Sequence, residues 1–336
     1  MKKLIAAVTA FAFAVTLAAC GEKKERTTSA GGLERVNLVL DYVPNPDHAG
    51  IYGAQRDGDF RQSGLDVKTI VPSDPAAPLK LLASGRADIA ISYEPELMLA
   101  RDRGLDLVAI GALIQRPLTS IMSAGGEKPV RQVSDLAHGR VGTAGIPYQD
   151  AYLHTVLQHA GVDPSSVNRV NVGFNLIPAM ISKRVDATLG AFWNVEGVQL
   201  RRAHKHPSII PINKAGVPTY DELVFVARAS DLRTRGELFR SFMQALSTAH
   251  RAVRRDPAKG VDALQAADKN LKRSDTEASV RATLPAFFPS DTSKPFGYMD
   301  PRQWAAYARW MLANKLIKQP AAPRMLTNEF LPGEGL

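Results

Sequence analysis

The sequence predicts an α/β protein made of two similar lobes, joined by a hinge around a central cleft. Short β-branched and apolar stretches alternate with helical stretches, which predicts parallel sheets covered by helices. A short segment also recurs: residues 84–88 read Ser-Gly-Arg-Ala-Asp and residues 182–186 read Ser-Lys-Arg-Val-Asp, each ending a helix and preceding a strand. One Rossmann-like lobe for each copy, with two chain crossings between them, would form the hinge.

The first lobe is expected from residues 33–124 together with residues 223–336. Pro44 and Pro46 end its first strand, Pro72 ends its second, and Pro95 stands at the favoured first position of a helix. The predicted elements are, in order, strand 36–40, helix 48–56, strand 65–71, helix 74–82, strand 89–92, helix 96–103 and strand 107–113.

The second lobe is expected from residues 125–222 and repeats this alternation. Its predicted elements are strand 140–143, helix 150–160, strand 167–172, helix 177–182 and strand 187–189. A strand at 223–227 returns the chain to the first lobe, and helices follow. Helix 302–316 starts after Asp300-Pro301, and helix 236–254 has apolar residues about one turn apart, at Leu238, Phe242, Leu246 and Ala249.

The N-terminus has the pattern of an export signal. Lys2 and Lys3 precede an apolar run at residues 4–19, so residues 1–20 are predicted to be a signal peptide. Leu-Ala-Ala-Cys at its end resembles the bacterial lipobox, in which the cysteine is lipidated. The polar residues 21–32 are predicted to form a flexible tether. We therefore expect an extracytoplasmic protein, in the periplasm or on the outer face of the plasma membrane, anchored by lipidated Cys20.

Composition narrows the function classes. Cys20 is the only cysteine, which excludes an internal disulfide, a cysteine zinc site and a thiol nucleophile. The net charge of +9 falls by two, to +7, without Lys2 and Lys3, and the basic residues alternate with acids. This indicates solvated helix faces rather than a nucleic-acid site, with attraction to anionic lipid or a permease left open. No catalytic triad, phosphate loop or metal-ligand spacing is found, so we expect no catalytic residue, cofactor or metal.

Residues 40–52, which read Leu-Asp-Tyr-Val-Pro-Asn-Pro-Asp-His-Ala-Gly-Ile-Tyr, resemble the opening of a known family. It is the thiamine-pyrimidine-binding and pyrimidine-synthase family of the periplasmic binding proteins. Further matching segments lie at residues 64–67, 84–88, 92–94, 141–142 and 192–197. The resemblance implies a type II periplasmic binding fold that binds a formylaminopyrimidine or hydroxymethylpyrimidine type of thiamine precursor. An ABC permease and its ATPase would then be the partners for uptake.

Alternatives remain for the cargo and the activity. The family usually has tryptophan where Tyr42 stands; a riboflavin-binding relative is similar, and sulfonate or taurine binders share the fold more distantly. The synthase branch relies on a cysteine-rich motif and iron, and this chain has no cysteine beyond Cys20, so the resemblance favours import over an enzyme. A phosphate or sulfonate would be expected at residues 142–145, where backbone N–H groups precede a helix.

Four aromatic residues follow predicted strands. Because ligands of α/β sheets lie beyond the carboxyl ends of the strands, these rings are expected to hold a small planar heterocycle. They are Tyr42, Tyr93, Tyr148 and Trp193.

Polar residues in the same loops are expected to contact the edge of the heterocycle. Glu94 and Glu196 could accept hydrogen bonds from an exocyclic amine or a ring N–H, although Glu94 could instead cap a helix. Asn45 and His48 lie in the first loop, within the most specific part of the resemblance. Each of these residues has an ordinary structural role as its alternative.

Overall fold

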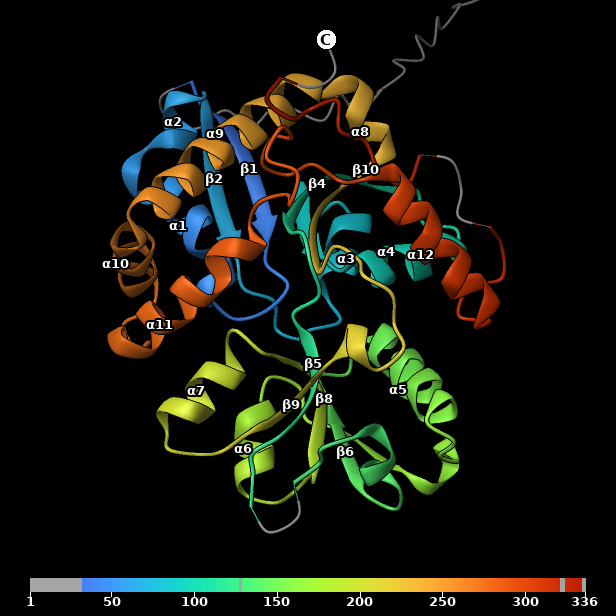
Figure 1. Cartoon of the computed structure of the whole chain (residues 1–336). Helices are drawn as coiled ribbons and strands as arrows, with labels where there is room; N and C mark the ends of the chain where they lie inside the picture. Colours follow the sequence, from blue (N-terminus) through green and yellow to red (C-terminus); the bar gives the residue numbers. More distant parts are fainter. Residues whose placement is uncertain (1–31, 127–128, 321–323, 334–336) are drawn as a thin grey trace, which may run out of the picture.

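Two α/β lobes lie one above the other in the computed structural model, joined by two extended segments (Figure 1). The structure describes residues 32–126, 129–320 and 324–333. The two-lobed fold predicted from the sequence is confirmed. The predicted signal peptide, its Cys20 and all of the tether except Gly32 lie outside the described residues. Within these ranges, no helix has the length and apolar character that a membrane span requires.

The first lobe is built on a five-stranded sheet in the order β2-β1-β3-β10-β4. Strands β1, β2 and β3 are parallel, and β10 runs antiparallel to both of its neighbours. The strands are β1 (Glu34–Val39), β2 (Leu65–Ile70), β3 (Ile89–Ser92), β4 (Leu107–Ile114) and β10 (Leu223–Arg228). The helices are α1 (Ala49–Asp57), α2 (Asp59–Gln62), α3 (Pro78–Ala83), α4 (Glu94–Asp102), α8 (Ala229–Thr234), α9 (Gly236–Arg255), α10 (Pro257–Ala267), α11 (Arg273–Thr283) and α12 (Pro301–Ala313).

The second lobe has a sheet of the same design, in the order β7-β6-β8-β5-β9. Here β5 is the antiparallel strand. The strands are β5 (Thr119–Ser123), β6 (Arg140–Thr143), β7 (Asn168–Asn171), β8 (Ala187–Phe192) and β9 (Ser208–Pro211), and the helices are α5 (Pro147–His159), α6 (Leu176–Ile181) and α7 (Glu196–Arg202).

The antiparallel strand in each sheet is the one that enters from the other lobe. β5 follows the crossing after β4, and β10 follows the crossing after β9. The parallel-sheet prediction is therefore wrong for this strand. Because β5 pairs with β8 and β9, the first crossing lies between Ile114 and Thr119. The first lobe thus ends before β5, and not at residue 124.

Local sequence signals set several element boundaries. Strands β3 and β6 have the predicted bounds, and α9 buries Leu238, Phe242, Leu246 and Ala249 as its periodicity predicts. The helix predicted from residue 74 begins only at Pro78, because the Asp74 carboxylate accepts a hydrogen bond from Ala76 N–H in a turn.

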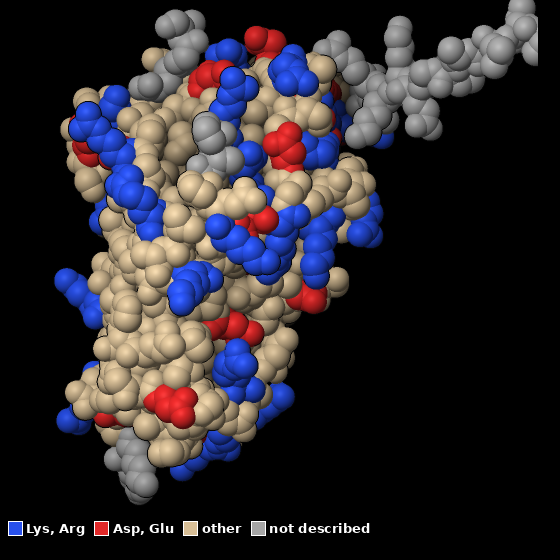
Figure 2. Space-filling view, turned by 90° about the vertical axis from the view of Figure 1, so that its right-hand side faces the viewer, with Lys and Arg blue, Asp and Glu red and all other residues tan. Residues whose placement is uncertain are grey.

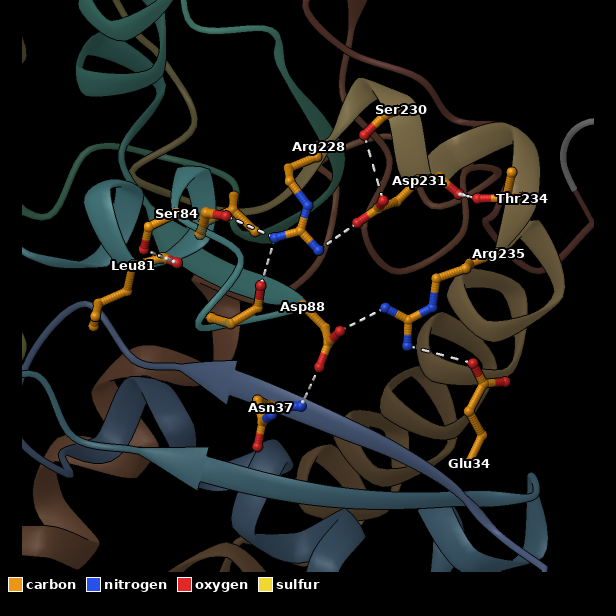
Figure 3. Close-up of polar contacts among 12 residues, drawn as sticks. Glu34, Asn37, Leu81, Ser84, Asp88, Arg228, Ser230, Asp231, Thr234 and Arg235 are labelled. Atoms are coloured by element: carbon orange, nitrogen blue, oxygen red, sulfur yellow. Dashed lines mark hydrogen bonds and ion pairs between the residues drawn. The ribbon is translucent and has the colours of Figure 1, made fainter. Parts of the chain in front are cut away.

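The recurring segment makes the same contact in both lobes. Asn37 N–H donates to Asp88 Oδ2 at 2.8 Å (Figure 3), and Asp88 N–H donates to Asn37 O at 2.9 Å. In the second lobe, Arg140 N–H donates to Asp186 Oδ2 and Asp186 N–H donates to Arg140 O, both at 2.8 Å. Each aspartate thus fixes the start of a central strand against its neighbour.

Each of these two aspartates also forms an ion pair with an arginine. Arg235 binds both Asp88, at 2.5 Å, and Glu34, at 3.3 Å (Figure 3), whereas Asp186 pairs with Arg140 at 2.8 Å. The two lobes are therefore structural repeats at this point, and the repeat visible in the sequence marks equivalent strand starts.

Position two of the repeat has a left-handed backbone in both copies, with φ of 75° at Gly85 and 58° at Lys183. Because a side chain is strained there, we expect Gly85→Ala to lower the free energy of unfolding by about 1–2 kcal/mol. Lys183→Gly is expected to raise it, by up to about 1 kcal/mol. Urea unfolding of the two variants beside the wild type measures both; a stabilising Gly85→Ala would contradict the assignment.

Candidate functional site

The two crossings meet at one buried carboxylate, that of Glu222. It accepts hydrogen bonds from Leu118 N–H at 2.6 Å, from Thr119 N–H and Thr119 Oγ1–H at 2.8 Å, and from Tyr220 O–H at 3.0 Å. Burial raises the pKa of Glu222 to about 7, against the lowering effect of these donors. Since Leu118 lies in the first crossing, Thr119 begins β5 directly after it, and Tyr220 lies in the second crossing, Glu222 ties the hinge together.

A cavity of about 440 Å³ lies between the lobes. Its size falls within the range typical of small-molecule sites. The first lobe contributes the loop after β1, Tyr93 after β3, and α11; the second contributes the loops after β6 and β7, the end of β8, and α7. As expected for α/β sheets, the strand ends of both lobes therefore converge on this cavity.

Tyr42 and Phe174 face each other across the lobes in the cavity wall. Their ring centroids are 4.6 Å apart at an interplanar angle of 82°, an edge-to-face contact. Burial, with the nearby Glu196 and Asp41 carboxylates, raises the pKa of the Tyr42 hydroxyl above its ordinary value. The wall therefore offers neutral aromatic surface from both lobes.

Asp41 places a carboxylate in the wall of the cavity, although it is only 1% exposed. His48 Nε2 lies 2.8 Å from its Oδ1, and Tyr93 O–H donates to its Oδ2 at 3.1 Å. Tyr93 itself lines the cavity, as its sequence position predicts. His48 does not line it: the imidazole is buried behind Asp41 and positions that carboxylate.

Asn45 lines the cavity but its amide is already engaged. Its Oδ1 accepts from Asp47 N–H at 2.8 Å, and its Nδ2 donates to Val43 O at 3.2 Å. The side chain caps the 3-10 turn Pro46–His48. It therefore shapes the loop that carries Tyr42.

Glu196 is the first residue of α7 and lines the cavity. Its Oε2 accepts from Phe192 N–H at 2.7 Å, at the end of β8. Burial raises the pKa of Glu196 to about 7. The second lobe thus supplies a carboxyl group that can exist in either protonation state near neutral pH, opposite Asp41 of the first lobe.

Besides His48, three of the predicted site residues lie outside the cavity lining, and these three brace the hinge. Tyr148 is buried behind Tyr93, with ring centroids 5.1 Å apart, and its hydroxyl lies 3.4 Å from Thr119 Oγ1. Trp193 Nε1–H donates to Pro117 O at 3.1 Å. Glu94 Oε2 accepts from Asp221 N–H at 2.7 Å.

The prediction that four aromatic rings share one hollow is therefore wrong for Tyr148 and Trp193, and the prediction of an edge contact is wrong for Glu94. All three side chains turn toward the crossing segments: Trp193 directly follows β8, whereas Glu94 and Tyr148 lie in the first turns of α4 and α5.

Several lining residues were not predicted. Asp41 precedes Tyr42 within the family-like segment, and Phe192 begins the matching segment at residues 192–197, whereas Phe174 and the residues of α11 had no such signal. Gln149 Oε1 accepts from Ala144 N–H at 2.8 Å. A Cβ at Gly190 would lie 2.4 Å from Gln149 Nε2, so the glycine allows this side chain to reach the wall.

Polar contacts hold the lobes together beside the cavity. Asn194 Nδ2–H donates to Asp47 Oδ1 and Thr283 Oγ1, both at 2.7 Å, and all three residues are buried. Burial and the neighbouring Asp41 raise the pKa of Asp47. Nearby, Arg202 of α7 pairs with Asp275 of α11 at 2.5 Å.

On the face in Figure 2, acidic side chains lie among the basic ones. In the part of the chain that the structure describes, no cluster of three or more His, Cys, Asp and Glu side chains could hold a metal ion.

The sequence is similar to curated proteins of two kinds. It is 31% identical over 292 residues to the formylaminopyrimidine-binding protein of Halalkalibacterium halodurans, covering 86% of this chain and 88% of that protein. It is 24% identical over 302 residues to the 4-amino-5-hydroxymethyl-2-methylpyrimidine phosphate synthase of Legionella pneumophila, covering 89% and 92%.

The fold is similar to that of the alkanesulfonate-binding protein SsuA of Xanthomonas axonopodis pv. citri, solved with bound MOPS. The TM-score is 0.66 at 16% identity, and the match covers 87% of this chain and 98% of that one. The type II periplasmic binding fold is thereby confirmed. The family described as NMT1/THI5 like matches residues 45–260, and the resemblance found in the sequence is confirmed. The chain belongs to the NMT1/THI5-like family.

Proposed function

We propose that this protein is the solute-binding component of an ABC importer and captures a thiamine pyrimidine precursor, of the formylaminopyrimidine or hydroxymethylpyrimidine type, for uptake. One observation carries the proposal: a cavity between two hinged lobes combines aromatic walls with a carboxyl group from each lobe. The similarity to a formylaminopyrimidine-binding protein supports the cargo.

An aminopyrimidine matches the chemistry of this cavity. Tyr42, Phe174 and Tyr93 offer aromatic surface to a flat ring, while Asp41 can accept a hydrogen bond from its amino group. Glu196 Oε2 already accepts from Phe192 N–H, which leaves Oε1 for the cargo. With a proton, Oε1 can donate to a ring nitrogen; without one, it can accept from an N–H.

Capture rather than catalysis is the proposed role. The synthase branch needs a cysteine-rich motif with iron, and the only cysteine of this chain is Cys20, at the expected lipidation site. Anchoring of the mature protein by lipidated Cys20 would keep it beside the permease and its ATPase. Its two-lobed fold is also that of solute-binding proteins.

A sulfonate is a poor match to this cavity, although the structural neighbour binds one. Asp41 and Glu196 line the wall, and Lys272 at the rim is the only Lys or Arg among the described lining residues. An anionic sulfonate would therefore face carboxyl groups with little compensating positive charge.

A thermal-shift panel tests the cargo. The mature protein is heated with formylaminopyrimidine, hydroxymethylpyrimidine, thiamine, riboflavin or taurine. A ligand at about a hundred times its Kd adds roughly 2.7 kcal/mol of stability, so one of the two pyrimidine precursors is expected to raise the unfolding midpoint by several degrees. A shift with riboflavin or taurine alone would refute the proposed cargo.

Glu196→Ala removes a charge-capable hydrogen-bonding partner from the cavity. We expect the Kd for the pyrimidine precursor to rise roughly 10- to 150-fold, as measured by calorimetry. The exposed Glu277→Ala, on α11, is the matched control and is expected to bind like the wild type. Wild-type affinity in Glu196→Ala would remove Glu196 from the site.

The raised pKa of Glu196 predicts a dependence of stability on pH. Because the folded-state pKa of about 7 exceeds the ordinary value of 4.5, the stabilisation is complete below pH 4.5 and is lost as pH rises through about 7. Glu196→Gln cannot ionise, so its unfolding free energy should fall less between about pH 5 and 8. Asp221 and Glu222 also have pKa values of about 7, so part of the fall in unfolding free energy with pH remains in both proteins. Parallel curves for the two proteins would show that Glu196 does not titrate in this window.

A further inference from the structure

We propose that Ser279 of α11 and Gln199 of α7 form a second recognition point in the cavity, which binds a neutral hydrogen-bonding substituent of the cargo, such as a hydroxyl or formamide group. This inference deepens the proposed function and rests on it. Helix α11 lies beyond residues 45–260, the part of the chain that the family match covers.

One side of the cavity is walled by a pair of helices, one from each lobe. Helix α7 contributes Glu196 and Gln199, three residues or about one turn apart and hence on one face. Helix α11 contributes Asp275 and Ser279, which are four residues apart and also on one face of their helix. The Arg202–Asp275 ion pair joins the two helices, so Asp275 already has its partner. Polar atoms of both lobes therefore face the same space.

Ser279 is the unusual member of this wall. It is 1% exposed, and its Oγ has no hydrogen-bond partner among the residues that the structure describes. The neighbouring hydroxyls on α11 are satisfied within the helix: Thr276 donates to Lys272 O at 3.0 Å and Thr283 donates to Ser279 O at 2.8 Å. Because a buried hydroxyl without a partner costs free energy, Ser279 is suited to a group that enters the cavity.

Gln199 supplies the matching group from the second lobe. It is half-buried in the cavity wall, and its side-chain amide makes no hydrogen bond to any of the residues described. An amide and a hydroxyl can each donate and accept, which suits a cargo substituent that also does both. The nearby Glu196 carboxyl disfavours an anionic group, so this point should reject the phosphate ester of the same pyrimidine.

Calorimetry with two matched probes tests the proposal. The first is formylaminopyrimidine, and the second is the same aminopyrimidine with a methyl group in place of the polar substituent. Ser279→Ala is expected to weaken the first probe roughly 2- to 10-fold, the effect of one lost hydrogen bond, and to leave the second unchanged. Ser274→Ala, an exposed serine on the same helix, is the control and should match the wild type with both probes.

Equal affinity of Ser279→Ala and wild type for formylaminopyrimidine would overturn the proposal, as would an equal loss for both probes. If the wild type binds neither probe, the proposed function fails. The unfolding midpoint of Ser279→Leu then tests separately whether Ser279 faces the cavity. A leucine that enters the cavity leaves the unfolding midpoint near that of the wild type, which supports a cavity-facing position. A fall of several degrees, from overpacking of a closed interior, would overturn it.

Discussion

Glu222 is the constraint on which the arrangement of the two lobes depends. A buried carboxylate is costly unless donors surround it, and the donors here come from both crossing segments: Leu118 and Thr119 from one, Tyr220 from the other. Trp193 and Glu94 add contacts to the same two segments. These contacts therefore hold the two crossing segments in a fixed arrangement, and this arrangement sets the geometry of the cavity beside them.

The cavity follows from the repeated design of the lobes. Both sheets have the same strand order, with the crossing strand inserted antiparallel, so the loops after β1 and β3 face those after β6 and β8. Each lobe thereby contributes a carboxyl group, Asp41 from one and Glu196 from the other. Neither lobe alone encloses a ring, which explains why capture and lobe closure are linked in this fold.

Sequence reasoning succeeded where short-range chemistry decides the structure. Short β-branched and apolar stretches gave the bounds of β3 and β6, and helical periodicity gave the buried face of α9. It failed for β5 and β9, which were not predicted as strands: β5 pairs with both β8 and β9, and these pairings come from distant parts of the chain. It also failed for Tyr148 and Trp193: a position after a strand predicts nearness to the cleft, but packing against the hinge sets the direction of the side chain.

By itself, the sequence determined the alternation of strands and helices, the repeat that marks two lobes, and the loop that carries Asp41 and Tyr42, since these depend on neighbouring residues. Only the tertiary structure decided which side chains share the cavity. It turned His48 into a support for Asp41 and brought Ser279, more than two hundred residues away in the chain, into the same wall as Tyr42. The physical reason is that the burial and the hydrogen-bond partners of a side chain depend on residues that are far apart in the sequence. These residues come together only after both lobes have folded against each other.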